Sequence, residues 1–133
     1  MVAKHLTAVF TETVDAWIEN RGSFCHRNEW LKGTEGEIYV RYLYSSSFAA
    51  EIRNRLDLAN FQISTKYQKK GIARSLIEIA CAKPVQSVKV ELIHTIEWGK
   101  KIREYQFPNR KTIVVSHWDD IISVCWDKDS SDD

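Results

Sequence analysis

Residues 61–77 read FQISTKYQKKGIARSLI, and within this stretch the hydrophobic period changes. Phe61 and Ile63 alternate with polar residues, which is the pattern of a β-strand with one buried face. From Ile72 onward the apolar residues recur at steps of three and four, as on one face of an α-helix. Pro84 is expected to end that helix. The stretch therefore predicts a strand, a tight turn and a helix, in that order.

The turn between this strand and helix, residues 68–71, has a composition that suits an anion. The N-terminus of a helix presents unpaired backbone N–H groups and a partial positive charge. Gly71 has no side chain that would keep a ligand away from this backbone. Lys69, Lys70 and Arg74 add positive charge. We expect a phosphate or pyrophosphate to bind here, and a plain turn of an α/β protein is the alternative.

Length and composition limit the class of protein. The 133 residues suffice for one domain with a hydrophobic core and are too few for two. We expect a single domain over residues 1–126 and an acidic, serine-rich, disordered tail over residues 127–133. The net charge of +1 argues against a strong nucleic-acid binder. No apolar run is long enough to span a bilayer, and the first residues lack the apolar region of a signal peptide.

The three cysteines, Cys25, Cys81 and Cys125, are widely spaced and form no C-x-x-C pair. This spacing predicts neither a disulfide framework nor a structural zinc site, and we expect no metal. Free thiols indicate a reducing compartment, so we expect the protein in the cytoplasm.

The N-terminal third of the chain predicts helices followed by a strand. We expect a helix over residues 10–20, with Thr11 as its N-cap, and a short second helix over residues 26–31. Residues 6–10 fit either a first strand or the lead-in to the helix. A strand is predicted over residues 37–44, which are rich in β-branched and aromatic side chains.

The remainder of the chain alternates predicted strands and helices. Residues 48–56 fit either a helix or the start of a strand that continues to residue 63. After the helix that begins at residue 72, the predicted elements are a strand over 87–93, a helix from 95 or 96 to 105, and strands over 112–115 and 121–126. The succession of strand, helix and strand over residues 56–93 predicts a βαβ unit with a parallel strand pair.

Residues 63–73 resemble the acetyl-CoA-binding motif of the GNAT superfamily of N-acetyltransferases. That motif reads, loosely, apolar-x-Pro-x-Tyr-[Arg/Gln]-x-x-Gly-x-[Gly/Ala]. The residues that stand at its three defining positions are Gln68, Gly71 and Ala73, and Ile63 and Tyr67 also fit. Thr65 stands where Pro is common. The place of this run, after a strand and at the head of an amphipathic helix, is the context that the chemistry requires.

The resemblance implies an α+β fold: a mixed, mostly antiparallel sheet with a central parallel βαβ unit and flanking helices, matching residues 35–126. It favours a strand from about Asn54. It also implies an N-acyltransferase that moves an acetyl group from acetyl-CoA to an amine by direct attack. The amine would belong to a small molecule or a protein. Trp17, His26 and Trp30 would lie near the acceptor wall, with core packing as the alternative for the tryptophans.

The resemblance also implies which residues hold the cofactor. Backbone N–H groups from Gln68 to Ala73 would bind the pyrophosphate, and the end of the preceding strand would pair with the pantetheine arm. A backbone N–H of that strand would polarise the thioester carbonyl. The expected cofactor-binding residues are Phe61, Ile63, Thr65, Gln68, Lys69, Lys70, Gly71, Ile72, Ala73 and Arg74.

Three residues are candidates for the general base that this chemistry needs: Asp57, Glu91 and His94. Glu91 lies in the predicted strand that diverges from the cofactor strand, and histidine is the residue type that transfers protons near neutral pH. A solvated or structural role is the alternative for Glu91 and for His94.

The general acid of the family is not at its usual place. Many members have an Asn at the start of the last helix and a Tyr seven residues later. Aligned on Phe107, these positions hold Thr95 and Ile102. Tyr105, about one helical turn further on, is the candidate that remains.

Two other functional classes stay open. The missing Asn and Tyr favour a catalytically weak or inactive GNAT-fold module that binds CoA or a protein partner. A nucleic-acid-associated protein with a basic patch around the turn is opposed by the near-neutral charge and the lack of base-stacking motifs. The last predicted hairpin, with Val114, Ile122 and Val124, would suit pairing of edge strands in a homodimer.

Overall fold

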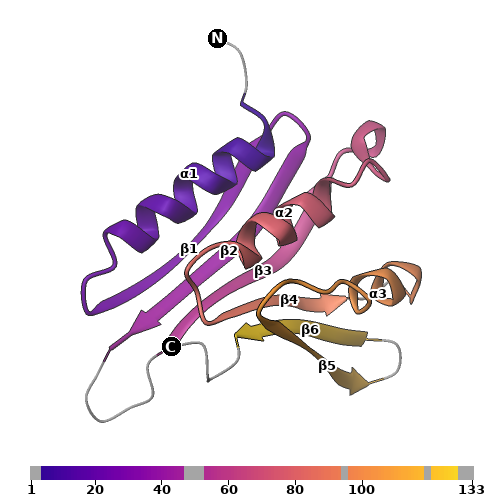
Figure 1. Cartoon of the computed structure of the whole chain (residues 1–133). Helices are drawn as coiled ribbons and strands as arrows, with labels where there is room; N and C mark the ends of the chain where they lie inside the picture. Colours follow the sequence, from indigo (N-terminus) through magenta and orange to yellow (C-terminus); the bar gives the residue numbers. More distant parts are fainter. Residues whose placement is uncertain (1–3, 47–52, 94–95, 119–120, 129–133) are drawn as a thin grey trace.

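The computed structural model describes residues 4–46, 53–93, 96–118 and 121–128 (Figure 1). The elements in chain order are α1 (Leu6–Glu19), β1 (Phe24–Gly33), β2 (Gly36–Ser45), β3 (Arg53–Ile63), the short 3-10 helix η1 (Thr65–Tyr67), α2 (Ile72–Cys81), β4 (Ser87–Ile93), α3 (Ile96–Ile102), β5 (Arg110–Trp118) and β6 (Ile121–Lys128). The expected α+β class is confirmed, since these residues combine α-helices with one mixed six-stranded sheet.

The strands are ordered β1-β2-β3-β4-β6-β5. Every neighbouring pair is antiparallel except β3 and β4, which are parallel and are connected through α2. The predicted βαβ unit is therefore confirmed. The parallel ladder is short, running from Arg55 opposite Ser87 to Leu58 opposite Val90. Beyond it the two strands diverge, as Figure 1 shows, and β3 continues alone on that side to Ile63.

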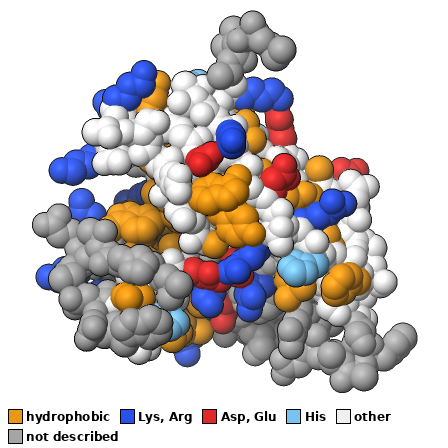
Figure 2. Space-filling model, turned by 180° about the vertical axis from the view of Figure 1, so that it is seen from behind, with side chains coloured by type: hydrophobic (Ala, Val, Ile, Leu, Met, Phe, Trp, Pro, Cys, Tyr) orange, Lys and Arg blue, Asp and Glu red, His pale blue; other side chains and the backbone are white. Residues whose placement is uncertain are grey.

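The core lies between one face of the sheet and the helices α1 and α2, which also contact each other (Figure 1). On β2 the alternate residues Ile38, Val40 and Tyr42 are completely buried and face these helices. Helix α1 contributes Leu6, Phe10 and Val14, which recur every four residues and are equally buried. Figure 2 shows the opposite face, where charged side chains gather beside a hydrophobic patch.

A bulge in β3 changes which of its side chains face the helices. Val40 pairs with Leu58 but Tyr39 pairs with Asn60, so Ala59 is the extra residue. Because of it, Leu58 and Phe61 lie on the same face of the sheet although they are three residues apart. The bulge therefore turns the end of β3 toward the start of α2.

The predicted helix over residues 26–31 is wrong, because these residues lie in β1. The whole of β1 pairs with β2, from Phe24 opposite Ser45 to Gly33 opposite Gly36. Pairing along ten residues outweighs the weak local preference of this stretch for a helix.

The expected N-cap Thr11 is also wrong, because α1 begins at Leu6 and Thr11 lies inside it. Residues 6–10 are thus helix and not strand. The N–H of Leu6 donates a hydrogen bond of 2.8 Å to the Glu35 carboxylate, which comes from the turn between β1 and β2. The pKa of Glu35 is lowered, mainly because this hydrogen bond stabilises its carboxylate form. Glu35, which accepts the hydrogen bond from the first N–H of the helix, is thus distant from α1 in the sequence.

The other predicted elements are confirmed, with shifts at their ends. The strands over 37–44, 87–93, 112–115 and 121–126 lie in β2, β4, β5 and β6, and the strand arm expected from residue 54 lies in β3. Helix α3 ends at Ile102, before the expected end at Tyr105. Strand β6 includes Asp127 and Lys128, and residues 129–133 are outside the described part of the chain. None of the helices in the described ranges has the length and apolar character required to cross a membrane.

Candidate functional site

A pocket of about 570 Å³ lies between the end of β3, the turn before α2, the first turn of α2 and α3. Its walls come from segments that are distant in sequence: β3 provides Phe61 and Ile63, α3 provides Trp98 and Lys101, and Tyr105 follows α3. The volume is within the roughly 300–1,000 Å³ of usual small-molecule sites. The pocket therefore has room for a ligand of cofactor size.

The N-terminus of α2 contributes backbone donors to this pocket. The first N–H bonded within the helix is that of Ser75, which donates to the carbonyl of Gly71 at 2.9 Å. The N–H groups of Ile72, Ala73 and Arg74 come before it and have no acceptor in the helix. Gly71 has φ +79°, and a Cβ placed on it would meet no atom within 4 Å. A ligand can thus approach this backbone closely.

The turn before α2 is shaped by its own hydrogen bonds. The Gln68 side-chain amide donates to the carbonyl of Ile63 at 3.0 Å, which folds the turn back onto the end of β3. The Gln68 backbone N–H donates to the carbonyl of Thr65 at 3.2 Å. This N–H, which was expected to bind a pyrophosphate, thus already has an acceptor within the turn. Lys69 has φ +62°, which is uncommon for a residue other than glycine and turns the chain sharply here.

The charged side chains that line the pocket in the described part of the chain are of one sign. They are Lys69, Arg74 and Lys101, and no Asp or Glu is among the described lining residues. The Arg74 guanidinium lies 4.8 Å from the centre of the Tyr105 ring, and its Nε lies 3.1 Å from a carboxylate oxygen of Glu78. These contacts hold Arg74 at the edge of the pocket. Unpaired N–H groups together with three cations favour an anionic ligand.

Aromatic rings close the pocket on the side of the diverging strands. The Phe61 and Trp98 rings meet edge to face with 5.3 Å between their centres. Tyr105 is held by its backbone carbonyl, which accepts hydrogen bonds from Trp126 Nε1 at 2.9 Å and from Thr112 Oγ1 at 3.2 Å. The pocket therefore combines cations and backbone donors with aromatic rings.

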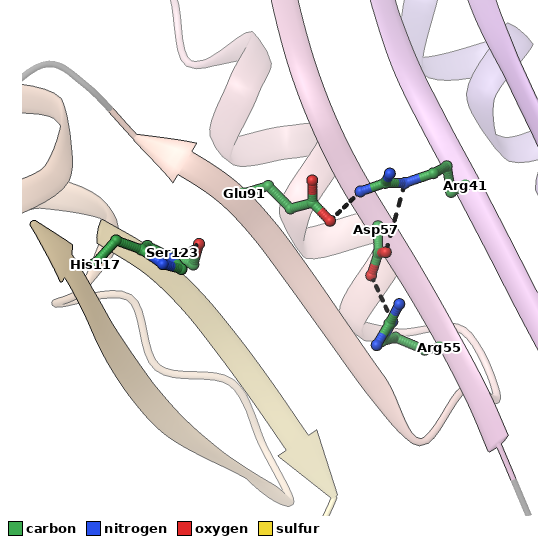
Figure 3. Close-up of polar contacts among 6 residues, drawn as sticks. All are labelled: Arg41, Arg55, Asp57, Glu91, His117 and Ser123. Carbon is green, nitrogen blue, oxygen red and sulfur yellow. Dashed lines mark hydrogen bonds and ion pairs between the residues drawn. The ribbon is translucent and has the colours of Figure 1, made fainter. Parts of the chain in front are cut away.

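A second cluster of polar side chains lies on the opposite face of the sheet, and Figure 3 shows how its members point toward one another. Arg41 on β2 forms an ion pair with Glu91 on β4, and its Nε lies 3.7 Å from Asp57 on β3. Arg55 Nε lies 2.9 Å from Asp57 Oδ1. The cluster spans the parallel ladder just before the strands diverge.

Asp57 is almost completely buried in this cluster, with 2% of its surface exposed. Burial is the main cause that raises the pKa of Asp57, and the charge of Glu91 also raises it, while Arg55 and Arg41 act in the opposite direction. The contact with Arg55 does not have the alignment of a hydrogen bond. Asp57 is thus an acid that holds its proton more tightly than an ordinary Asp.

The sequence-predicted site residues separate into groups. Eight of the ten expected cofactor-binding residues line the pocket, and the two that do not are Thr65 and Lys70. Tyr105 lines it as well, whereas Asp57 and Glu91 lie in the cluster on the other face. His94 and Thr95 fall outside the described residues.

The three residues expected near an acceptor wall are dispersed. Trp17 is half-buried on α1 and packs against the core, in line with the alternative given for it. His26 and Trp30 lie on β1, where the Trp30 ring packs against the tilted Tyr39 ring with 5.3 Å between ring centres. The wall of two helices that the resemblance implies is thus replaced here by one helix and a strand.

Trp98, Lys101 and Tyr67 line the pocket but were not expected there. Trp98 and Lys101 are three residues apart, which places them on one side of α3. That spacing is visible in the sequence, but it gives no sign of which element this side of the helix faces.

Other reactive groups in the described residues are less suited to a substrate. His117 Nε2 lies 2.8 Å from Ser123 Oγ (Figure 3), but Ser123 is only 1% exposed. Cys25, Cys81 and Cys125 are free thiols, and burial raises the pKa of Cys81 to about 12, so it is not a nucleophile near neutral pH. Among the described residues no group of three potential ligands could hold a metal ion.

Comparison with models of known protein families, with curated proteins and with solved structures gives no match for this chain.

Proposed function

We propose that this protein is a GNAT-type N-acyltransferase that binds acetyl-CoA in the pocket between β3, α2 and α3. The proposal rests mainly on one observation: free N–H groups at the start of α2 meet three cations in a pocket whose described lining residues include no Asp or Glu. A diphosphate is the anion that this combination suits best. The aromatic rings of Phe61 and Trp98, which also line the pocket, suit the uncharged part of the same ligand.

The order of elements supports the family. From β1 onward the chain has an antiparallel meander, a parallel βαβ unit, a helix and a final hairpin. This is the succession that the resemblance implies. It differs at the start, where one helix precedes the sheet in the described residues.

The residues present fit the cofactor. Gly71 leaves open space over the helix N-terminus, and the side of β3 beyond Leu58 is not paired with β4. An extended amide-containing arm can bind such a strand edge through backbone hydrogen bonds. When bound, acetyl-CoA supplies a thioester whose acetyl group is transferred to an amine. The protein's part is to hold the two reactants in reach of each other, which accounts for much of the rate of such reactions.

Asp57 and Glu91 are poorly placed to accept the proton of the amine, because both lie on the face of the sheet opposite the pocket, in ion pairs with Arg41 or Arg55. Asp57 is in addition only 2% exposed. Tyr105 lines the pocket, and in this proposal its hydroxyl donates a proton to the leaving thiolate.

A second candidate function is a module that binds CoA without turnover. It is favoured by Ile102, which is completely buried in the core where family members have a reactive Tyr. Acetylation of any amine by acetyl-CoA at a rate above that of the reaction without protein would separate the enzyme from this module.

The test of the site is a matched pair of variants, Gly71→Asp and Gly71→Asn. Both side chains tolerate the positive φ of this position, and there is space for either. They have nearly the same size and differ in charge. We expect calorimetry with CoA to show affinity at least about tenfold lower for Gly71→Asp than for Gly71→Asn, because a carboxylate would repel the diphosphate.

Equal CoA affinities of the two variants would show that the diphosphate does not bind at this turn. Absence of CoA binding to the wild-type protein at millimolar concentration would remove the acyltransferase proposal altogether.

A further inference from the structure

The sheet has two edge strands, β1 and β5, and each pairs with one neighbour among the described residues (Figure 1). An edge strand exposes backbone N–H and C=O groups that can pair with another chain, and proteins commonly protect such an edge with charged side chains. β1 carries three exposed charged residues, Arg27, Glu29 and Lys32. Residues 112–116 of β5 read TIVVS and carry no charge. β5 is therefore the edge that is open to pairing with another strand.

Two adjacent valines of β5 are exposed at this edge. Val114 is 41% exposed and Val115 is 42% exposed. Successive side chains of a strand point to opposite faces, so each face of the sheet has an apolar side chain at the same point of the edge. Ile122 and Val124, which were expected at such an edge together with Val114, lie on β6 between β4 and β5. A new strand can thus pair with β5 but not with β6.

The sequence of β5 is complementary to itself about Val114. In an antiparallel pair, alternate residues direct both backbone groups toward the neighbouring strand, and the residues between them direct both away from it. Two copies of β5 must therefore pair about one residue that lies opposite its own copy. With Val114 at this centre, Ile113 lies opposite Val115 and Thr112 lies opposite Ser116. Apolar side chains then meet apolar ones, and hydroxyls meet hydroxyls.

The neighbouring registers match less well. A pair centred on Ile113 would place Lys111 opposite Val115, and a pair centred on Val115 would place Ile113 opposite His117. In the register centred on Val114 the two copies of Lys111 lie at opposite ends of the paired segment, roughly 20 Å apart, so they do not repel each other strongly.

We propose that this protein forms a two-fold symmetric homodimer in which β5 pairs with β5 of a second copy, antiparallel and centred on Val114. The second copy covers the exposed valines and joins the two six-stranded sheets into one continuous sheet. β5 contributes no residue to the pocket in the described part of the chain. The inference is therefore independent of the proposed function.

The experiment is sedimentation velocity of the full chain over a range of concentrations. Pairing of one strand buries a small area, so we expect a reversible dimer that predominates at about 100 µM. The matched variants are Val114→Lys, which places two positive charges directly opposite each other at the centre, and Val114→Thr, which keeps the branched shape without a charge. We expect a dimer dissociation constant at least about tenfold higher for Val114→Lys than for Val114→Thr.

A mixture of two variants tests the register and the folding of the variants together. Val114→Glu protein alone should dimerise as poorly as Val114→Lys protein. An equimolar mixture should dimerise at least about tenfold more tightly than either, because opposite charges then meet at the centre. Trp30→Lys changes an exposed aromatic residue on β1, at the other edge of the sheet, and is the control that should dimerise like the wild type.

Three results would overturn the proposal. The first is a wild-type protein that stays monomeric at 100 µM and above. The second is a dimer that dissociates in Trp30→Lys protein and persists in Val114→Lys protein, since it would use the edge at β1. The third is a mixture of the Lys and Glu variants that dimerises no better than its components, because Val114 would then not lie opposite its own copy.

Discussion

Asp57 shows how the environment of one residue changes the behaviour of the whole protein with pH. In the unfolded chain its carboxyl ionises near 3.8, and in the folded protein burial moves this ionisation to higher pH. Between these two pKa values the folded protein binds more protons than the unfolded chain. The free energy of unfolding therefore falls as the pH rises through this window.

Asp57→Asn removes this ionisation, because an amide does not titrate. We expect the variant to gain stability relative to wild type as the pH is raised from about 4 toward 7, by about 1.4 kcal/mol for each unit of pKa shift. Urea unfolding of both proteins at several pH values measures the difference. Glu29→Gln, which changes an exposed carboxylate on β1, is the control. A difference that stays constant with pH would contradict the prediction.

At the scale of single residues, the sequence was informative where the contacts are local. The turn before α2 follows a motif of adjacent residues, so most of its pocket-lining members were predicted. Glu35 and Trp98 could not be assigned, because their partners Leu6 and Phe61 lie some thirty residues away or more. Their roles depend on the tertiary fold and not on a local pattern.

At the scale of elements, Arg110 at the start of β5 joins the end of α2 to the sheet. Its guanidinium donates hydrogen bonds of 2.9–3.2 Å to the backbone carbonyls of Cys81, Lys83, Val85, Gln86 and Trp126. The carbonyls of Cys81 and Lys83 lie at or after the C-terminus of α2, where the helix leaves its acceptors unpaired. The other three belong to residues at or near β4 and β6.

Arg110→Lys should lower the free energy of unfolding by at least about 2 kcal/mol. Lysine keeps the charge, but its three donors cannot reach five carbonyls, and half-buried acceptors without partners are costly. Chemical denaturation measures the loss. The neighbouring exposed Lys111, replaced by Ala, should change stability by no more than about 0.5 kcal/mol. Equal effects of the two substitutions would contradict the role assigned to Arg110.

Most helices and strands were predictable from the periodicity of hydrophobic residues, and the two wrong predictions have the same cause. Residues 26–31 form a strand because β2 lies beside them, with Trp30 opposite Tyr39 and Leu31 opposite Ile38. The start of α1 is fixed by Glu35 in the turn after β1. In both cases a neighbour in space, absent from the local window of sequence, decides the conformation.

At the scale of the whole molecule, ligand binding should protect two separate segments at once. If CoA binds as proposed, addition of CoA should slow amide hydrogen exchange at residues 69–74 and along β3 beyond Leu58. Strand β1, at the far edge of the sheet, should be unaffected. Mass spectrometry of peptides from the exchanged protein measures this. Gly71→Asp protein is the control and should show little change, and protection spread evenly over all six strands would contradict the proposed site.

The mixed sheet and its parallel pair were predictable, because the change of period at residues 61–77 signals a βαβ unit. The pocket as a whole was not, since α3 reaches it through tertiary packing, such as that of Gly99 against Ile93 and Ile122 and of Trp98 against Phe61. The length of the parallel ladder was also beyond prediction, although it determines where the strands diverge.

That short ladder has a consequence for how the molecule folds. β1, β2 and β3 follow one another as antiparallel neighbours, so their contacts close small loops and are expected to form early. β4 joins β3 through the crossover over residues 64–86, and over only four residue pairs. The pocket lies beside this junction, and we expect it to be completed late, after the main folding barrier. A ligand of the pocket should therefore slow unfolding and leave the rate of folding almost unchanged.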